Sequence, residues 1–327
     1  MWEIRNETPF PAERLTVVDK HGQRHWVVVV KATFMIEADG QTVRAEHQVP
    51  PMLTPEYRGE PGKSSLVYEQ DLLAPKPYTD VYLNATAYAP NHSPCSEVIV
   101  ELEMPWASKR LHVVGDRVWS RNLMGIDEPG PPRPFLAIPI IYERAFGGYD
   151  DASPDCRHHR LHPENPIGVG AFSRDLPNIK LLGGSSKQTA GFGASCSYWT
   201  PRRDFQGTYD DAWFATQKPL LPLDHDPRNL QCAPLDQQAH PHLEGGETFR
   251  LTNLNPDRPL IVFRLPTHTF TFTTFIGERV VRHAAQIHTV VIEPDFPRVI
   301  VVWHSNLSCH HDIDDIDATQ ILEVQRG

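Results

Sequence analysis

The sequence predicts a mainly β protein: two packed antiparallel β-sheet lobes, sandwich or barrel-like, with long ordered Pro/Gly-rich loops and few short helices. Two observations support this fold class. Runs rich in Val, Ile, Thr and aromatic residues occupy both ends of the chain, as is typical of strands. In addition, 31 prolines among 327 residues leave little room for long helices, because proline fixes φ and removes a backbone donor.

The expected organisation is one domain with three parts. These are an N-terminal β lobe at 1–125, a loop-rich central region at 126–246 and a C-terminal β lobe at 247–327. No repeat of fixed period and no low-complexity linker divides the chain.

The N-terminal lobe shows strand patterns separated by turn signals. The predicted strands cover 14–18, 25–36, 41–43, 79–88, 97–103 and 109–119. Residues 27–30 are valines on both faces, so their strand is expected to be central. A buried helix is the alternative, and the β-branched residues disfavour it.

The C-terminal lobe repeats this pattern. Its predicted strands cover 248–251, 260–265, 269–275, 288–293 and 299–304, with a hairpin loop around 294–297. Residues 267–274 alternate Phe270 and Phe272 with threonines, which predicts one apolar face. The tail is expected to be an acidic patch at 310–317 followed by a last apolar turn through Ile321 and Val324.

The central region concentrates proline and glycine, so we expect an ordered, irregular surface. Loops fixed on a rigid scaffold are where recognition residues collect. The exception is a short helix that opens within 207–213, with acidic residues in its first turn, and is ended by Pro219 and Pro222.

Charge and composition exclude several classes of partner. The net charge of −10 and the absence of a Lys/Arg cluster argue against nucleic acid and anionic membranes. The first residues lack a charged n-region and an apolar h-region, and no apolar run reaches membrane length. Five isolated cysteines suit a reducing compartment, so a cytoplasmic location is expected.

Motifs for chemistry are incomplete. Residues 59–64 resemble a phosphate loop, but Tyr57 stands where its leading glycine belongs. Residues 312–317 fail the calcium-loop pattern, and neither G-x-S-x-G nor H-E-x-x-H occurs. We therefore predict no catalytic residues and no cofactor.

Two clusters contain the residue types that ligate zinc. They are Cys156, His158, His159 and His162, and Cys309, His310 and His311 with Asp312. Adjacent histidines on a loop or strand point apart, so each cluster would need a distant fourth ligand. Solvated loop histidines are the favoured interpretation, and no metal site is predicted.

An ordered succession of short stretches runs along nearly the whole chain. They are 6–10 (NETPF), 31–34 (KATF), 76–81 (KPYTDV), 115–119 (GDRVW), 142–148 (YERAFGG), 165–168 (NPIG), 176–179 (LPNI), 201–202 (PR), 207–209 (GTY) and Trp213. In these stretches the chain resembles a bacterial domain-of-unknown-function family whose genes accompany type VI secretion spike proteins and their effectors. Asn84 and the His-rich insert at 156–162 depart from the family pattern.

The resemblance implies a cytoplasmic, non-enzymatic adaptor or chaperone that binds a secreted effector protein and helps load it onto the spike-tip protein. Aromatic and arginine side chains would anchor such a partner, because interface energy concentrates in these types. The candidates are Trp119, Tyr142, Arg144, Phe146, Trp199, Arg202, Tyr209 and Trp213. The alternative for this set is that the side chains are core and brace the central loops.

Two other function classes stay open. A hydrolase would need carboxylates brought together only by the fold, and the candidates are Glu143, Asp204, Asp210 and Asp211. A carbohydrate-binding or structural β-module would expose aromatic residues in a planar row over a shallow groove.

Overall fold

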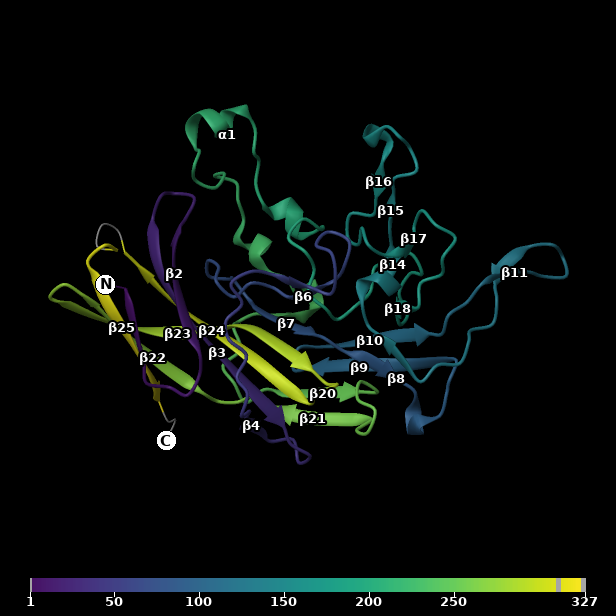
Figure 1. Cartoon of the computed structure of the whole chain (residues 1–327), viewed down its shortest axis with the longest axis horizontal. Coiled ribbons are helices and arrows are strands. Elements are labelled where there is room, and N and C mark those ends of the chain that lie inside the picture. The colour runs from purple at the N-terminus through teal and green to yellow at the C-terminus, as the bar shows by residue number, and fades with distance from the viewer. Residues whose placement is uncertain (1, 310–312, 325–327) are drawn as a thin grey trace.

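Two β-sheets packed face to face form the body of the protein (Figure 1). The computed structural model describes residues 2–309 and 313–324. The mainly β fold class predicted from the sequence is confirmed.

The larger sheet has ten strands. Its main path runs in the order β1-β25-β22-β23-β24-β3-β2, while β4 pairs with β3, β7 with β23 and β19 with β7. The strands are β1 (Glu3–Asn6), β2 (Ala12–Val18), β3 (Arg24–Ile36), β4 (Thr42–Arg44), β7 (Thr79–Leu83), β19 (Gln238–Ala239), β22 (Thr269–Ile276), β23 (Arg279–Glu293), β24 (Arg298–Ser308) and β25 (Ile316–Val324). Most pairs are antiparallel, but β1 runs parallel to β25 and β7 parallel to β23.

The smaller sheet has five strands in the order β18-β10-β9-β20-β21. They are β9 (Glu97–Met104), β10 (Ala107–Val114), β18 (Ile179–Leu181), β20 (Thr248–Thr252) and β21 (Leu260–Arg264). Segments expected to form separate N- and C-terminal lobes therefore contribute to both sheets.

Short strand pairs and helical turns lie within the loop segments. The two-stranded pairs are β5 (Glu56–Tyr57) with β6 (Leu66–Tyr68), β8 (Thr86–Tyr88) with β13 (Ala137–Pro139), β11 (Trp119–Arg121) with β12 (Asp127–Pro129), β14 (Phe146–Gly147) with β17 (Val169–Gly170), and β15 (Tyr149–Asp150) with β16 (Arg160–Leu161). The one α-helix among the described residues is α1 (Asp211–Thr216), and 3₁₀ turns lie at Pro90–His92, Tyr142–Arg144, Cys156–His158, Arg202–Phe205, Pro227–Leu230 and Leu235–Gln237. None of the described helices is long and apolar enough to cross a membrane.

The central strands of the larger sheet are buried on both faces. Val290 and Ile292 of β23 join the core shared with the smaller sheet, whereas Val291 faces a second core. That second core is made with loop residues such as Tyr142 and Trp199. The Pro/Gly-rich central region therefore covers the outer face of the sheet and has an apolar interior of its own.

The valine run at 27–30 lies in a central strand, as its pattern predicted. β3 pairs with β24 on one side and with β2 on the other, and the valines are fully buried on alternating faces. The predicted short helix is also present as α1, whose first turn is capped by Asp210 accepting from the Trp213 N–H.

Three segments differ from the sequence predictions. The last apolar turn is instead part of β25, because this segment finds partners in both β1 and β22. The hairpin strand expected to continue to residue 119 ends at Val114, where Gly115 packs so closely that a Cβ would lie 1.9 Å from the Arg133 carbonyl oxygen. The strand expected over 79–88 is divided into β7 and β8.

Buried and half-buried histidines gather beside the central strands. The rings of His288 and His304 lie 4.0 Å apart, and His242 stacks on His288 at 5.6 Å. Burial, followed by the positive charge of Lys76, lowers the pKa of His304 to about 3. Burial likewise lowers the pKa of His283 on β23 to about 4. These side chains are neutral in the folded protein at neutral pH.

Acidification should therefore destabilise the fold. Histidines in the unfolded chain take up protons near pH 6.5, whereas His304 stays neutral in the folded chain down to about pH 3. Stability is thus fully present above pH 6.5 and is lost as the pH falls toward 3, by about 1.4 kcal/mol per pH unit for each such histidine. Urea unfolding between pH 7 and 4.5 measures this slope.

His304→Gln should flatten the slope by the contribution of one histidine, because glutamine does not titrate. The control is His21→Gln at an exposed position, which should leave the slope unchanged. An equal slope in wild type and His304→Gln would contradict the assignment of His304 as a buried neutral group.

Candidate partner-binding surface

The loops over the outer face of the large sheet are tied to it through Asp80 on β7. This carboxylate is fully buried. Its Oδ2 accepts from Lys76 Nζ and from the Cys232 N–H, both at 2.8 Å, and its Oδ1 accepts from Gln231 Nε2 at 2.8 Å and the Ala233 N–H at 3.2 Å. One charged group thus fixes residues 231–233 against a central strand.

The surroundings of Asp80 keep Lys76 charged. Burial alone would lower the pKa of the Lys76 amine, but the adjacent Asp80 carboxylate outweighs it and raises that pKa. The same amine also donates to Thr289 Oγ1 at 3.0 Å on β23. Burial raises the pKa of the neighbouring Cys232 thiol well above its ordinary value, so this cysteine is a protonated thiol at neutral pH.

A second buried ion pair joins two other loops. Arg202 donates to Glu69 Oε2 at 2.7 Å, to the Asn229 carbonyl oxygen at 3.0 Å and to the Ser195 carbonyl oxygen. Arg202 is 5% exposed. Because one planar guanidinium bonds three separate segments, these loops hold a fixed relative position.

The 142–148 stretch is held by Asn165. The Asn165 side-chain amide donates to the carbonyl oxygens of Tyr142 (2.9 Å) and Phe146 (3.1 Å), and the backbone carbonyl oxygen of Asn165 accepts from the Gly148 N–H at 2.8 Å. A Cβ on Gly147 would lie 2.1 Å from that carbonyl oxygen. Glycine is therefore required at 147 by close packing.

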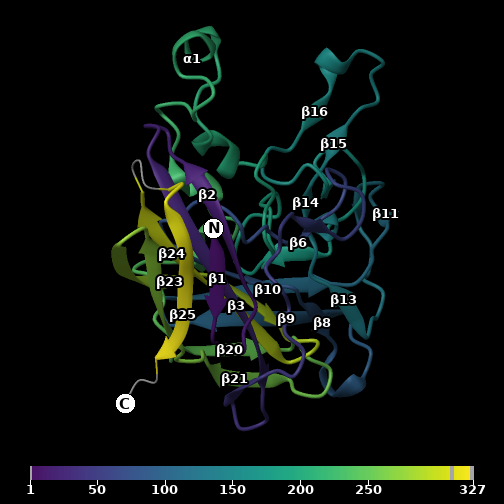
Figure 2. The same ribbon diagram turned by 60° about the vertical axis from the view of Figure 1, so that its left-hand side comes forward.

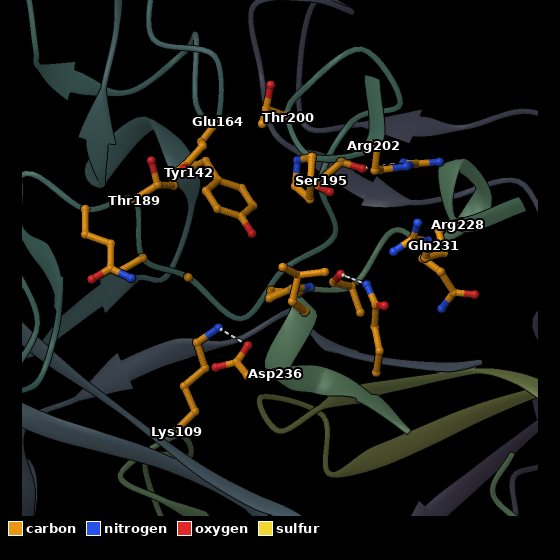
Figure 3. A pocket seen from close by; sticks show the side chains of 18 of the residues that line it. Lys109, Tyr142, Glu164, Thr189, Ser195, Thr200, Arg202, Arg228, Gln231 and Asp236 are labelled. Atoms are coloured by element: carbon orange, nitrogen blue, oxygen red, sulfur yellow. Dashed lines mark hydrogen bonds and ion pairs between the residues drawn. The ribbon is translucent and has the colours of Figure 1, made fainter. Parts of the chain in front are cut away.

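A cavity of about 660 Å³ opens between these loops and β10 (Figure 3). Tyr142, Ser195 and Arg202 line one side, and Lys109 and Asp236 form an ion pair of 2.9 Å on another. Arg228 also lines the cavity and pairs with Asp226 at 2.6 Å. The three cations at this cavity are thus each neutralised by a carboxylate of the chain itself.

Above the body, residues 207–223 form an excursion that carries an aromatic cluster, here named the α1 knob. Its members are Tyr209, Trp213 and Phe214. Tyr209 is 50% and Phe214 62% exposed, while the Trp213 ring lies 4.7 Å from that of Tyr209 and donates its Nε1–H to the Leu220 carbonyl oxygen at 2.9 Å. Figures 1 and 2 show α1 projecting from the body on the same side as the β15–β16 hairpin.

The α1 knob is anchored at its base. Lys20 donates from Nζ to the His225 carbonyl oxygen at 2.9 Å, and Gln217 donates to the Lys20 carbonyl oxygen at 2.6 Å. Asp224 accepts from the N–H and hydroxyl of Thr208 at 3.0 and 2.7 Å. The aromatic residues are therefore presented on a fixed loop.

The predicted anchor residues divide into two groups. Tyr142, Trp199 and Arg202 are buried, so these side chains brace the loops, although Tyr142 and Arg202 also reach the cavity. The others reach solvent to different extents, and they are Trp119, Arg144, Phe146, Tyr209 and Trp213. Of these, the structure brings together only Tyr209 and Trp213 as a ring pair.

Phe214 was missed by the sequence prediction. The sequence did contain a signal for its exposure. Adjacent residues on a helix point about 100° apart, so Trp213 and Phe214 cannot both face the body. The cation of Lys218 lies 4.3 Å from the Phe214 ring centre, which keeps this exposed ring beside a positive charge.

Two of the four carboxylates considered for hydrolysis have structural roles of their own. Glu143 accepts from the Ser65 N–H at 2.7 Å and from its hydroxyl, and Asp210 caps α1. None of Glu143, Asp204, Asp210 and Asp211 lines the cavity described above.

The histidine-rich insert is organised by local hydrogen bonds. His159 contacts the Tyr149 hydroxyl at 2.7 Å with Nδ1 and the Ser153 carbonyl oxygen at 2.9 Å with Nε2. Within 2–309 and 313–324, no three His, Cys, Asp or Glu side chains converge in a way that would hold a metal. Of the second cluster, Cys309 is buried, whereas His310, His311 and Asp312 lie outside the described residues.

A scan against protein-family models matches residues 21–304 to DUF2169, described as an uncharacterized protein conserved in bacteria. The chain belongs to the DUF2169 family. The resemblance to a bacterial family of unknown function is thereby confirmed at the level of the family. Searches of curated proteins and of solved structures found no match.

The Asp80 contacts predict a large loss of stability on neutralisation in this DUF2169 protein. Asp80→Asn leaves the Lys76 amine buried without its counter-charge, and breaking a buried pair this way costs about 3–5 kcal/mol. The free energy of unfolding from urea titration measures it. The matched control is Glu60→Gln in the exposed Lys63–Glu60 pair, where we expect less than about 0.5 kcal/mol. Equal losses in both variants would contradict the role of Asp80.

Gly147→Ala should destabilise the 142–148 loop. The added methyl must displace the Asn165 carbonyl, and overpacking of this kind costs about 1–3 kcal/mol. Gly59→Ala is the control, because its Cβ would make only ordinary contacts of 3.6 Å with Ser64. If thermal unfolding showed both variants equally stable, close packing at Gly147 would not be the constraint.

Proposed function

We propose that this DUF2169 protein is a non-enzymatic adaptor that binds a type VI secretion effector and helps load it onto the spike complex. The observation that supports this most is the α1 knob, an exposed aromatic cluster on an anchored loop. Large aromatic side chains dominate the binding energy of protein interfaces. A partner that covers the knob would remove apolar ring surface from water without first ordering a mobile segment.

The rigidity of the loop base favours protein binding for a second reason. Ordering a flexible loop on binding offsets part of the interaction energy. The hydrogen bonds that Lys20 and Gln217 donate, and those that Asp224 accepts, fix the base of the knob in the unbound chain. The binding surface is therefore preorganised.

The cavity chemistry fits an adaptor better than a hydrolase. Its lysine and its two arginines each pair with a carboxylate of the same chain. General acid–base catalysis needs titratable groups free to exchange protons with a substrate. The thiol of Cys232 is buried and protonated, so it lacks the thiolate character of a nucleophile.

Co-expression with a type VI secretion effector and a spike protein of the same bacterium tests the proposal. Affinity purification of the wild-type chain should recover both proteins in stoichiometric amounts. Recovery of neither, from a stable folded chain, would contradict the proposed function.

The α1 knob should carry part of the binding energy. Tyr209→Ala combined with Phe214→Ala removes exposed rings and should weaken the affinity for one of the two proteins by about 30-fold, or about 2 kcal/mol. Titration calorimetry measures it. Phe296→Ala is the matched control, since Phe296 is a 69% exposed ring on the β23–β24 turn. Unchanged affinity in the double variant would remove the knob from the binding surface.

A further inference from the structure

The β11–β12 hairpin and its turn, residues 118–130, form an arm that extends from the body at an edge different from that of α1 (Figure 1). Its tip consists of Leu123, Met124 and Ile126. Their exposures are 107%, 80% and 56%. Leu123 is thus as exposed as in an extended chain. Removing a leucine side chain from water stabilises a protein, so the exposure of Leu123 leaves this free energy unused.

The tip is nonetheless held in one conformation. The Asn122 side-chain oxygen accepts from the N–H groups of Met124 and Ile126, both at 3.0 Å, and the Asn122 N–H donates to the Ile126 carbonyl oxygen at 2.9 Å. Gly125 supplies the positive φ of 76° that the turn requires. These hydrogen bonds close the turn between Asn122 and Ile126 and leave its apolar side chains exposed to solvent.

The base of the arm is braced as well. Trp119 donates its indole N–H to the Arg174 carbonyl oxygen, and the Arg174 guanidinium lies 5.6 Å from the Trp119 ring centre. Arg174 also pairs with Asp127 at 2.8 Å, which connects β12 to the same loop. Trp119, predicted from the sequence as a partner anchor, therefore supports the arm and is itself 40% exposed.

We propose that the arm is a second docking element, whose tip inserts into an apolar socket on a folded partner protein. A convex, preorganised tip with three apolar side chains complements a concave pocket. The partner is defined by this chemistry: a folded protein with an apolar depression wide enough for the Leu123 and Met124 side chains. The proposal relies on the proposed function only for the candidate partners used in its test.

A second copy of this chain fits the tip less well. Contact between two tips would bury only three apolar side chains per copy, whereas a stable dimer needs roughly 800 Å² per partner. Contact between a tip and another face of a second copy would be heterologous and would continue from copy to copy. The charge of −10 on each chain also opposes such association.

An extended peptide and a membrane fit less well too. A peptide that added a strand to the β12 edge would find no N–H at Pro129, nor at the prolines that follow at 131 and 132. The net charge of −10 disfavours contact with anionic lipid.

Substitution at the tip tests the arm. Leu123→Ser combined with Met124→Ser should weaken binding to the purified effector or to the purified spike protein at least tenfold. The melting temperature should stay that of the wild type, because Leu123 is fully exposed. Leu53→Ser, at an apolar residue that is 63% exposed elsewhere, is the matched control and should bind like the wild type. Affinities of the tip variant within twofold of the wild type for both proteins would overturn the proposal.

Photo-crosslinking decides the nature of the occupant in cells. With p-benzoylphenylalanine in place of Met124, we expect an adduct to one identified protein, with the link in an apolar pocket of a folded domain. That protein, once purified, should bind the tip variant at least tenfold more weakly than the wild type. An adduct to a second copy, an adduct to lipid, or no adduct above that obtained at position 53 would overturn the proposal.

The two proposals fail separately. If the wild type binds neither the effector nor the spike protein, the proposed function is wrong, and the arm is then judged on the crosslink and the purified crosslinked protein alone. If the wild type binds both but the tip variant does so equally well, only the arm proposal is wrong.

Discussion

The structure depends on one buried carboxylate. Asp80 lies on β7 between the two cores and accepts hydrogen bonds from a buried lysine and from the loop at 231–233. A charge in this position is tolerated only because all its acceptor sites are occupied. The hydrogen bonds to Asp80 therefore require the loop and the sheet to adopt one relative position. The apolar second core then packs over this junction.

This constraint explains how a chain with so much irregular structure presents fixed surfaces. Arg202 and Asn165 repeat the device on neighbouring loops, each bonding several backbone carbonyls from one side chain. With the loop bases fixed, the α1 knob and the β11–β12 arm can extend apolar side chains into solvent without collapsing onto the body. Two separate protrusions suit a protein proposed to hold two partners at once.

The regular part of the fold was predictable because its signals are local. The alternation of Phe270 and Phe272 with threonines marked β22, and Asp210 with the following prolines marked α1. The topology of the sheet could not be predicted in this way, because β25 pairs with β1 from the opposite end of the chain. The site was predictable only in part: proline- and glycine-rich stretches have no period, so nothing in the sequence tells that Trp199 points inward and Tyr209 outward.

Amide hydrogen exchange can show whether Asp80 holds the loops against the sheet. Cys232 and Ala233 lie in a loop, but their backbone N–H groups donate to the buried Asp80 carboxylate. These amides should exchange as slowly as the central amides of β23 and β24, close to the limit set by global unfolding. Exchange as fast as that of the exposed turn at 122–126 would show that the loops are not locked to the sheet.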